Sequence, residues 1–127
     1  MIYRDKYKKT GLARLRRAFV NSMNGLYKVY LTEAAFRQEV WIVTPLACIA
    51  IVFGRSYLET VILLTVLILV LVIELINSAI EVVVDRIGLE ENELSGFAKD
   101  IGSTSVFITI LLALVVWLLF LFDLLKF

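Results

Sequence analysis

The chain has 127 residues, of which 61% are hydrophobic and 20% are charged, and its net charge is +1. This hydrophobic content exceeds that of a soluble domain of the same length, so the sequence predicts a single membrane domain over residues 1–127. There is no histidine and only one cysteine, Cys48, which excludes internal disulfides, histidine-based zinc sites and Ser-His or Cys-His catalysis. Any chemistry must come from carboxylates, amides, hydroxyls and basic groups.

The N-terminal part of the chain is basic. Residues 1–10 form a basic arm, and residues 11–31 carry apolar side chains at steps of three or four with basic residues between them, which is typical of an amphipathic helix. We expect this helix on the membrane surface, with its lysines and arginines near anionic head groups. The long apolar runs begin only at Val40, so no cleavable signal peptide is expected.

Three apolar segments predict transmembrane helices, at residues 40–58, 60–84 and 101–122. The run from Val40 to Phe53 covers roughly 21 Å as a helix, so it needs its flanks to cross a hydrocarbon core of about 30 Å. Pro45 is expected in the first turns of this span, where proline disrupts a helix least. The third segment covers about 33 Å if it is helical throughout. The fold class predicted is all-α, with three transmembrane helices and one surface helix.

The charges predict an orientation in the membrane. Residues 1–39 hold nine Lys/Arg and three acids, whereas residues 40–127 hold four Lys/Arg and nine acids. Because positive charge favours the cytoplasmic side, we expect a cytoplasmic N-terminus. Three crossings then place the connection from Arg86 to Asp100 inside and the C-terminus outside.

The second predicted span carries a polar stripe, which we define as Glu74, Asn77, Ser78, Glu81 and Asp85. Their spacing of 0, 3, 4, 7 and 11 places them on one face of a helix. Ionisable groups within a span are costly, and they face protein or a water-filled cavity. A structural alternative is that these acids only pair with bases on neighbouring helices. The apolar stretches of the other two spans contain no Lys or Arg, which favours a functional site.

The depth of each acid suggests its role. Glu74 lies about 21 Å along the second span and Glu81 about 31 Å, near the cytoplasmic edge of the hydrocarbon. Glu74 therefore suits a general base that takes a proton from a lipid alcohol, and Glu81 suits a ligand of Mg²⁺. Further charged and polar groups stand at the cytoplasmic ends of the third span (Lys99, Asp100) and the first span (Glu33, Arg37, Gln38, Glu39). No P-loop or kinase glycine-rich motif is present, so a nucleotide site must be built from helices.

Three stretches resemble the prokaryotic integral-membrane diacylglycerol kinases: EAAFRQE at 33–39, ELINSAIEVVVDRIG at 74–88 and ELSGFAKDIGS at 93–103. The similarity extends with constant spacing from about Gly11 to Trp117. It implies a homotrimer in the bacterial inner membrane that transfers the γ-phosphate of MgATP to diacylglycerol, giving phosphatidate.

The resemblance also implies roles for individual residues. Glu74 matches the proposed base, and Glu33 and Glu81 match the Mg²⁺ ligands. Asn77 and Asp85 belong to the active site. The positions matching nucleotide contacts are Arg14, Glu33, Glu81, Glu90, Glu91, Asn92, Lys99 and Asp100. The positions on the lipid side are Arg14, Gln38, Glu74 and Ser103.

Two alternative functions remain open at this stage. A sister branch of the same family phosphorylates undecaprenol and shares the polar stripe, although the EAAFRQE stretch favours the diacylglycerol branch. A function of a different class is a small channel or assembly subunit with the acidic face as a cation pathway. A channel predicts ion flux without ATP consumption, and it would not need Lys99 and a basic surface helix at one end of the pathway.

Overall fold

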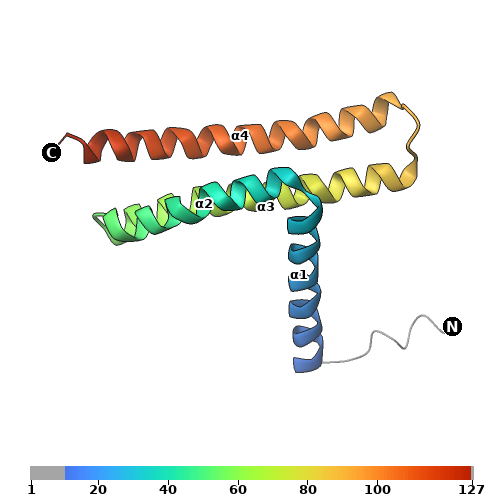
Figure 1. The fold of residues 1–127 in the computed structure, drawn as a ribbon, viewed down its shortest axis with the longest axis horizontal. Coiled ribbons are helices and arrows are strands. Elements are labelled where there is room, and N and C mark those ends of the chain that lie inside the picture. Colours follow the sequence, from blue (N-terminus) through green and yellow to red (C-terminus); the bar gives the residue numbers. More distant parts are fainter. Residues whose placement is uncertain (1–10, 127) are drawn as a thin grey trace. The chain divides into compact units, whose positions relative to one another are not determined.

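The computed structural model describes residues 11–126, which form four helices and no strand (Figure 1). The helices are α1 (Leu12–Thr32), α2 (Ala34–Phe53), α3 (Tyr57–Ile87) and α4 (Glu93–Leu124). This confirms the all-α fold class. The predicted basic arm at residues 1–10 lies outside the described residues. Two compact units meet in the sequence between Thr32 and Glu33: one contains α1, and the other contains α2, α3 and α4.

Helix α1 confirms the amphipathic helix that the spacing predicts. It spans 21 residues, and none of its side chains is buried. The helix is preceded by Gly11, whose φ of +74° is a left-handed conformation that favours glycine, and the Gly11 carbonyl accepts hydrogen bonds from the N–H groups of Arg14 and Leu15. Its location on a membrane surface stays a prediction.

Helices α2, α3 and α4 are each long and apolar enough to cross a membrane, which confirms three spans. Helices α3 and α4 extend beyond the predicted segments 60–84 and 101–122 at both ends. Helix α2 begins before the predicted segment 40–58 but ends at Phe53, five residues short of the predicted end, because Gly54 caps α2 and Ser56 caps the start of α3. Helix α2 begins at Ala34, so Pro45 lies in the helix interior and not in the first turns as expected. Proline there leaves the Trp41 carbonyl without its usual helical donor.

Polar side chains fix where two of these helices begin. The Ser56 hydroxyl accepts a hydrogen bond from the Glu59 N–H at 3.1 Å and caps α3. The Asn92 side-chain oxygen accepts from the N–H groups of Leu94 (2.9 Å) and Ser95 (3.3 Å) and caps α4. These are the positions where such side chains satisfy N–H groups that have no partner within the helix.

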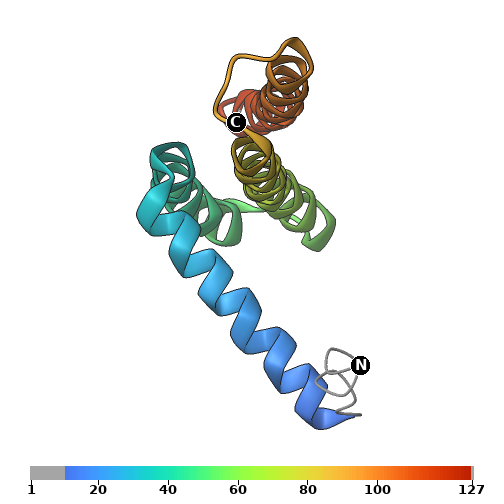
Figure 2. The same ribbon diagram turned by 90° about the vertical axis from the view of Figure 1, so that its right-hand side faces the viewer.

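Helix α3 is the central helix of the α2–α4 unit and packs against both α2 and α4 (Figure 2). The buried core has one contribution from α2, Ala50, and its main contributions from α3 and α4. On α4, the Trp117 and Phe120 rings meet edge to face with centroids 5.7 Å apart, a favourable aromatic geometry. The core members are Ala50, Leu63, Val66, Leu67, Val70, Ala113, Trp117 and Phe120.

Many large apolar side chains on the outer surfaces of these helices are exposed. Trp41 is 72% exposed on α2, Ile68 is 57% exposed on α3, and Ile108 is 59% exposed on α4. A soluble protein rarely exposes continuous apolar surface of this kind, whereas a lipid bilayer solvates it. The chain is therefore a membrane protein whose core is small relative to the surface it presents to lipid.

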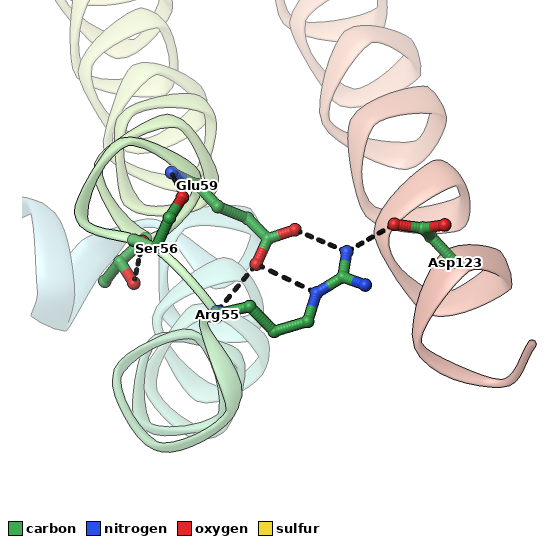
Figure 3. A network of polar contacts seen from close by, with 5 residues as sticks. Arg55, Ser56, Glu59 and Asp123 are labelled. Atoms are coloured by element: carbon green, nitrogen blue, oxygen red, sulfur yellow. Dashed lines mark hydrogen bonds and ion pairs between the residues drawn. The ribbon is translucent and has the colours of Figure 1, made fainter. Parts of the chain in front are cut away.

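At one end of the α2–α4 unit, an ion-pair network joins the α2–α3 turn to the last turn of α4 (Figure 3). We call Arg55, Glu59 and Asp123 the Arg55 cluster. Arg55 Nη2 pairs with Glu59 Oε1 at 2.8 Å and with an Asp123 carboxylate oxygen. The backbone N–H of Arg55 donates to Glu59 Oε2 at 2.7 Å. The hydrogen bonds to Glu59 and Asp123 raise the pKa of Arg55 above its already high value, so its guanidinium stays charged.

Candidate active site

The polar stripe runs from the packed interior of α3 towards its exposed C-terminal end. Glu74, Asn77 and Ser78 are buried, at 5%, 7% and 5% exposure. Glu81 is half-buried, and Asp85 is exposed. The buried part of the stripe therefore faces the neighbouring helices. The stripe leads from the buried Glu74 to the exposed end of α3 beside the α3–α4 loop.

Within the stripe, Asn77 and Glu81 are hydrogen-bonded. Asn77 Nδ2 donates to Glu81 Oε1 at 3.0 Å, one helical turn further along α3. The Asn77 side-chain oxygen is buried and has no hydrogen-bond partner within the part of the chain that the structure describes. Opposite Asn77, α4 presents the buried Gly102. The amide therefore orients one oxygen of Glu81 and leaves the other available for a further contact.

Glu74 interacts electrostatically with three other carboxylates. Glu81 on α3 and Glu33 at the start of α2 lie close enough to interact with it electrostatically, and so does Glu39 on α2. One carboxylate oxygen of Glu39 is buried without a hydrogen-bond partner in the described range. Glu39 was predicted to stand at the cytoplasmic end of the first span, without a functional role. Its position beside Glu74 depends on how α2 packs on α3, which spacing within one helix does not reveal.

A second part of the site is an open cavity at the α3–α4 loop, which we call the loop cavity. Its volume is about 620 Å³, and its lining includes Asp85 from α3, Glu90 to Asn92 from the loop, and Lys99 from α4. Lys99 Nζ pairs with Asp85 Oδ1 at 2.6 Å across this cavity. The structure thus brings together five residues that the sequence analysis assigned to the nucleotide or the active site.

The loop cavity is strongly acidic. Its walls include Asp85, Glu90, Glu91 and Glu93, and within residues 11–126 Lys99 is the one basic residue that lines it. These carboxylates would repel a nucleoside triphosphate unless cations compensated the negative charge of the cavity and the phosphates. Mg²⁺ bound with the nucleotide would supply such compensation. The half-buried carboxylates of Glu81 and Glu33 fit this ion, because Mg²⁺ prefers carboxylate and phosphate oxygens and needs only one or two protein carboxylates. Residues 11–126 contain no preformed group of three or more acidic, cysteine or histidine ligands.

An apolar groove is the third feature near the stripe. It has a volume of about 310 Å³, and its walls come from α2, α3 and α4, including Leu46, Leu67 and Trp117. Glu39 is the one charged residue in its described lining. The groove is therefore a lipid-compatible surface with one carboxylate, that of Glu39, in its wall.

The remaining predicted site residues lie in less enclosed positions. Gln38 on α2 and both Asp100 and Ser103 on α4 are exposed. Asn92, predicted to contact nucleotide, caps α4 with its side-chain oxygen. Arg14 lies on α1, in the other compact unit, where it is exposed. Their roles stay predictions.

Comparison with protein families decides which family the chain belongs to. Residues 20–121 match the model of the prokaryotic diacylglycerol kinase family, which covers most of the chain and all of the polar stripe. The chain belongs to the prokaryotic diacylglycerol kinase family. This membership identifies lipid phosphorylation as the reaction of the family and favours it over the channel and assembly-subunit alternatives.

Individual members of the diacylglycerol kinase family support the same assignment over nearly their full length. The chain is 42% identical to the diacylglycerol kinase of Haemophilus influenzae over 111 residues, which cover 87% of this chain and 94% of the relative. It is 43% identical to the diacylglycerol kinase of Escherichia coli K12 over 114 residues, covering 90% and 93%. The diacylglycerol kinase of Pseudomonas aeruginosa is 39% identical over 109 residues, covering 86% and 89%.

Proposed function

We propose that this protein transfers the γ-phosphate of MgATP to the hydroxyl of diacylglycerol and releases phosphatidate. The observation that carries the proposal is the graded polar stripe of α3, which leads from the buried Glu74 to an open acidic cavity beside Lys99. An apolar groove includes Glu39, which interacts electrostatically with Glu74. A lipid alcohol and a water-soluble nucleotide need these two different environments side by side. The reaction is proposed from family membership, and the roles of individual residues are proposed from their positions in this chain.

Glu74 is the proposed general base. Its side chain is buried on α3, and Glu39, which lines the apolar groove, interacts with it electrostatically. A diacylglycerol with its chains in the groove would bring its hydroxyl to these carboxylates. Glu74 would take the hydroxyl proton as the oxygen attacks the γ-phosphorus, a contribution of about 10²–10⁴ in rate for a well-placed base.

Glu81 and Glu33 are the proposed residues that hold Mg²⁺. Both lie close to Glu74, and Glu81 is oriented by its hydrogen bond from Asn77. When bound, Mg²⁺ would neutralise charge on the phosphates of ATP. Lys99 would contact the same phosphates from α4, exchanging part of its pairing with Asp85 for the nucleotide. The loop residues Glu90 and Glu91 would face the nucleoside side of the cavity.

The proposed setting is the bacterial inner membrane. The basic residues of the N-terminal part favour a cytoplasmic N-terminus, which places the loop cavity on the side where ATP is available. We also propose a homotrimer, on the strength of the family resemblance. Gln38 and Ser103, which are exposed on α2 and α4, would face the lipid substrate.

The competing acceptor is undecaprenol, whose phosphorylation would use the same base and cavity. The test is a turnover assay with purified protein and MgATP in which diacylglycerol and undecaprenol compete. Discrimination is read as the ratio of the two kcat/KM values. A ratio that favours diacylglycerol supports the proposal, and a ratio that favours undecaprenol would replace it.

A further inference from the structure

Gly102 on α4 lies directly against the side chain of Asn77 on α3. A Cβ atom built on Gly102 would be 2.2 Å from Asn77 Oδ1 and 3.3 Å from its Cγ. Separations under about 3 Å between such atoms are far inside van der Waals contact. Gly102 is therefore the residue that allows α4 to meet the Asn77 amide without a clash.

The Asn77 amide has a defined orientation between the two helices. Its nitrogen donates to Glu81 Oε1 at 3.0 Å, and its buried oxygen lies at Gly102 with no hydrogen-bond partner in residues 11–126. The α-hydrogen that glycine carries in place of a Cβ is small enough to sit against this oxygen, where it can form a weak C–H···O contact. The glycine therefore keeps the oxygen side of the amide towards α4 and the N–H side towards Glu81.

An alanine at this position would act on the amide and not on the helix spacing. The atoms closest to the added carbon are the end of the Asn77 side chain, whereas the Asn77 Cα would be 3.9 Å away, an ordinary contact. Rotation of the amide relieves the clash at lower cost than separation of two long packed helices. The same rotation removes the hydrogen bond to Glu81.

We propose that Gly102 is a positioning residue for the kinase reaction: it fixes the Asn77 amide, which in turn orients the Glu81 carboxylate towards the metal. This rests on the proposed role of Glu81 as a Mg²⁺ ligand. The groups that orient metal ligands contribute strongly to metal affinity, and losing one costs about 10- to 100-fold. Gly102 acts at one step further from the metal and touches neither the nucleotide nor the lipid.

The first measurement is structural and does not depend on activity. The chain has four asparagines, so protein labelled with ¹⁵N at asparagine gives few side-chain amide signals. Asn77→Asp assigns the Asn77 signal by its disappearance. Gly102→Ala is expected to shift this signal, whereas Gly25→Ala, the same change in the interior of α1 with nothing within 4 Å, is expected to leave it in place. An unshifted Asn77 signal in Gly102→Ala would overturn the proposal.

The second measurement is metal affinity, read by electron paramagnetic resonance of Mn²⁺ in the presence of a non-hydrolysable ATP analogue. Gly102→Ala should weaken Mn²⁺ binding about 10- to 100-fold, with a thermal unfolding midpoint close to that of the wild type. In the Asn77→Ala background the added methyl group has room, so Gly102→Ala should cause little further loss. An equal loss in both backgrounds would mean that the helices separate, and it would overturn the positioning role.

These outcomes separate the two proposals. If wild-type protein binds Mn²⁺ normally and Glu81→Gln binds it equally well, the metal role of Glu81 fails, and the positioning of that metal by Gly102 fails with it. If Glu81→Gln loses Mn²⁺ binding but Gly102→Ala does not, only the role of Gly102 fails.

Discussion

Lys99 of α4 and Asp85 of α3 form an ion pair across the loop cavity, with Lys99 Nζ 2.6 Å from Asp85 Oδ1. The pair connects the two helices at the point where the polar stripe becomes exposed. Lys99 also lies close enough to Glu81 to interact with it electrostatically. Lys99 thus lies between the exposed end of the stripe and the acidic residues of the loop cavity. Its positive charge would offset their repulsion of nucleotide phosphates.

The ion pair gives a prediction for nucleotide binding. Lys99→Met keeps the length of the side chain but removes its charge and leaves Asp85 without its partner. We expect kcat/KM for MgATP to fall about 10- to 100-fold, because charged hydrogen bonds to phosphate are among the stronger ones. Lys126→Met, at the other end of α4 beside Phe122, is the control and should retain normal kinetics. Unchanged nucleotide kinetics in Lys99→Met would remove this lysine from the site.

Glu74→Gln tests the base. Glutamine preserves the shape of the side chain but cannot accept the proton, so kcat should fall about 10²- to 10⁴-fold while the protein stays folded. Glu59→Gln is the matched control, since Glu59 lies on the same helix in the Arg55 cluster and far along the chain from the stripe. Phosphate transfer to diacylglycerol at the wild-type rate by Glu74→Gln would overturn the assignment.

Glu81→Gln tests the metal site. A neutral amide is a weaker Mg²⁺ ligand than a carboxylate, so the Mg²⁺ concentration needed for half-maximal activity should rise about tenfold or more. Removal of the metal with a chelator should stop turnover of the wild type, and added Mg²⁺ should restore it. The measurement is a magnesium titration at saturating ATP. A titration curve that is identical in the variant and the wild type would contradict the role of Glu81.

The core predicts which apolar residues of α3 matter for folding. Leu63 is 1% exposed and Ile68 is 57% exposed on the same helix. Leu63→Ala should destabilise the protein by roughly 2 kcal/mol, at the low end of the range for soluble proteins, because separated helices would leave Leu63 in lipid and not in water. Ile68→Ala should have little effect. Equal losses in a detergent unfolding experiment would show that lipid-facing contacts contribute as much as the core.

The Arg55 cluster gives a prediction about stability alone: its loss should lower the unfolding temperature without changing the rate of lipid phosphorylation. Arg55→Gln removes the ion pairs that join the α2–α3 turn to Asp123, so the unfolding temperature should fall by less than in Leu63→Ala. The difference between Arg55→Gln and wild type should shrink in high salt, because the cluster is exposed and screened. The rate of lipid phosphorylation at moderate temperature should be unchanged.

Features within one segment could be predicted from the sequence. The steps of three and four in α1, the apolar runs of the spans, and the spacing of Glu74, Asn77 and Glu81 each depend only on helical geometry. The helix ends were less predictable, because α2 continues into the charged stretch before Val40 and places Pro45 in its interior. The apolar run of a membrane helix shows which residues cross the hydrocarbon, but it does not show how many polar turns continue the helix beyond the bilayer.

Contacts between segments could not be predicted in the same way. Arg55 and Asp123 are 68 positions apart, and Gly102 meets Asn77 only because α4 packs on α3 in one register. The position of Glu39 beside Glu74 likewise depends on the packing of α2 on α3. In a chain rich in apolar residues many registers satisfy the hydrophobic pattern, so spacing alone does not select one.

The length of α3 decides where the two substrates can meet. Its 31 residues extend over roughly 46 Å, about 16 Å more than the hydrocarbon of a bilayer, and its C-terminal end carries the polar residues Glu81, Asp85 and Arg86. In the proposed orientation, the last turns of this helix would stand among the head groups. The hydroxyl of the proposed acceptor, diacylglycerol, would rest near the same depth, so the lipid would not have to leave its leaflet for the phosphate to be delivered.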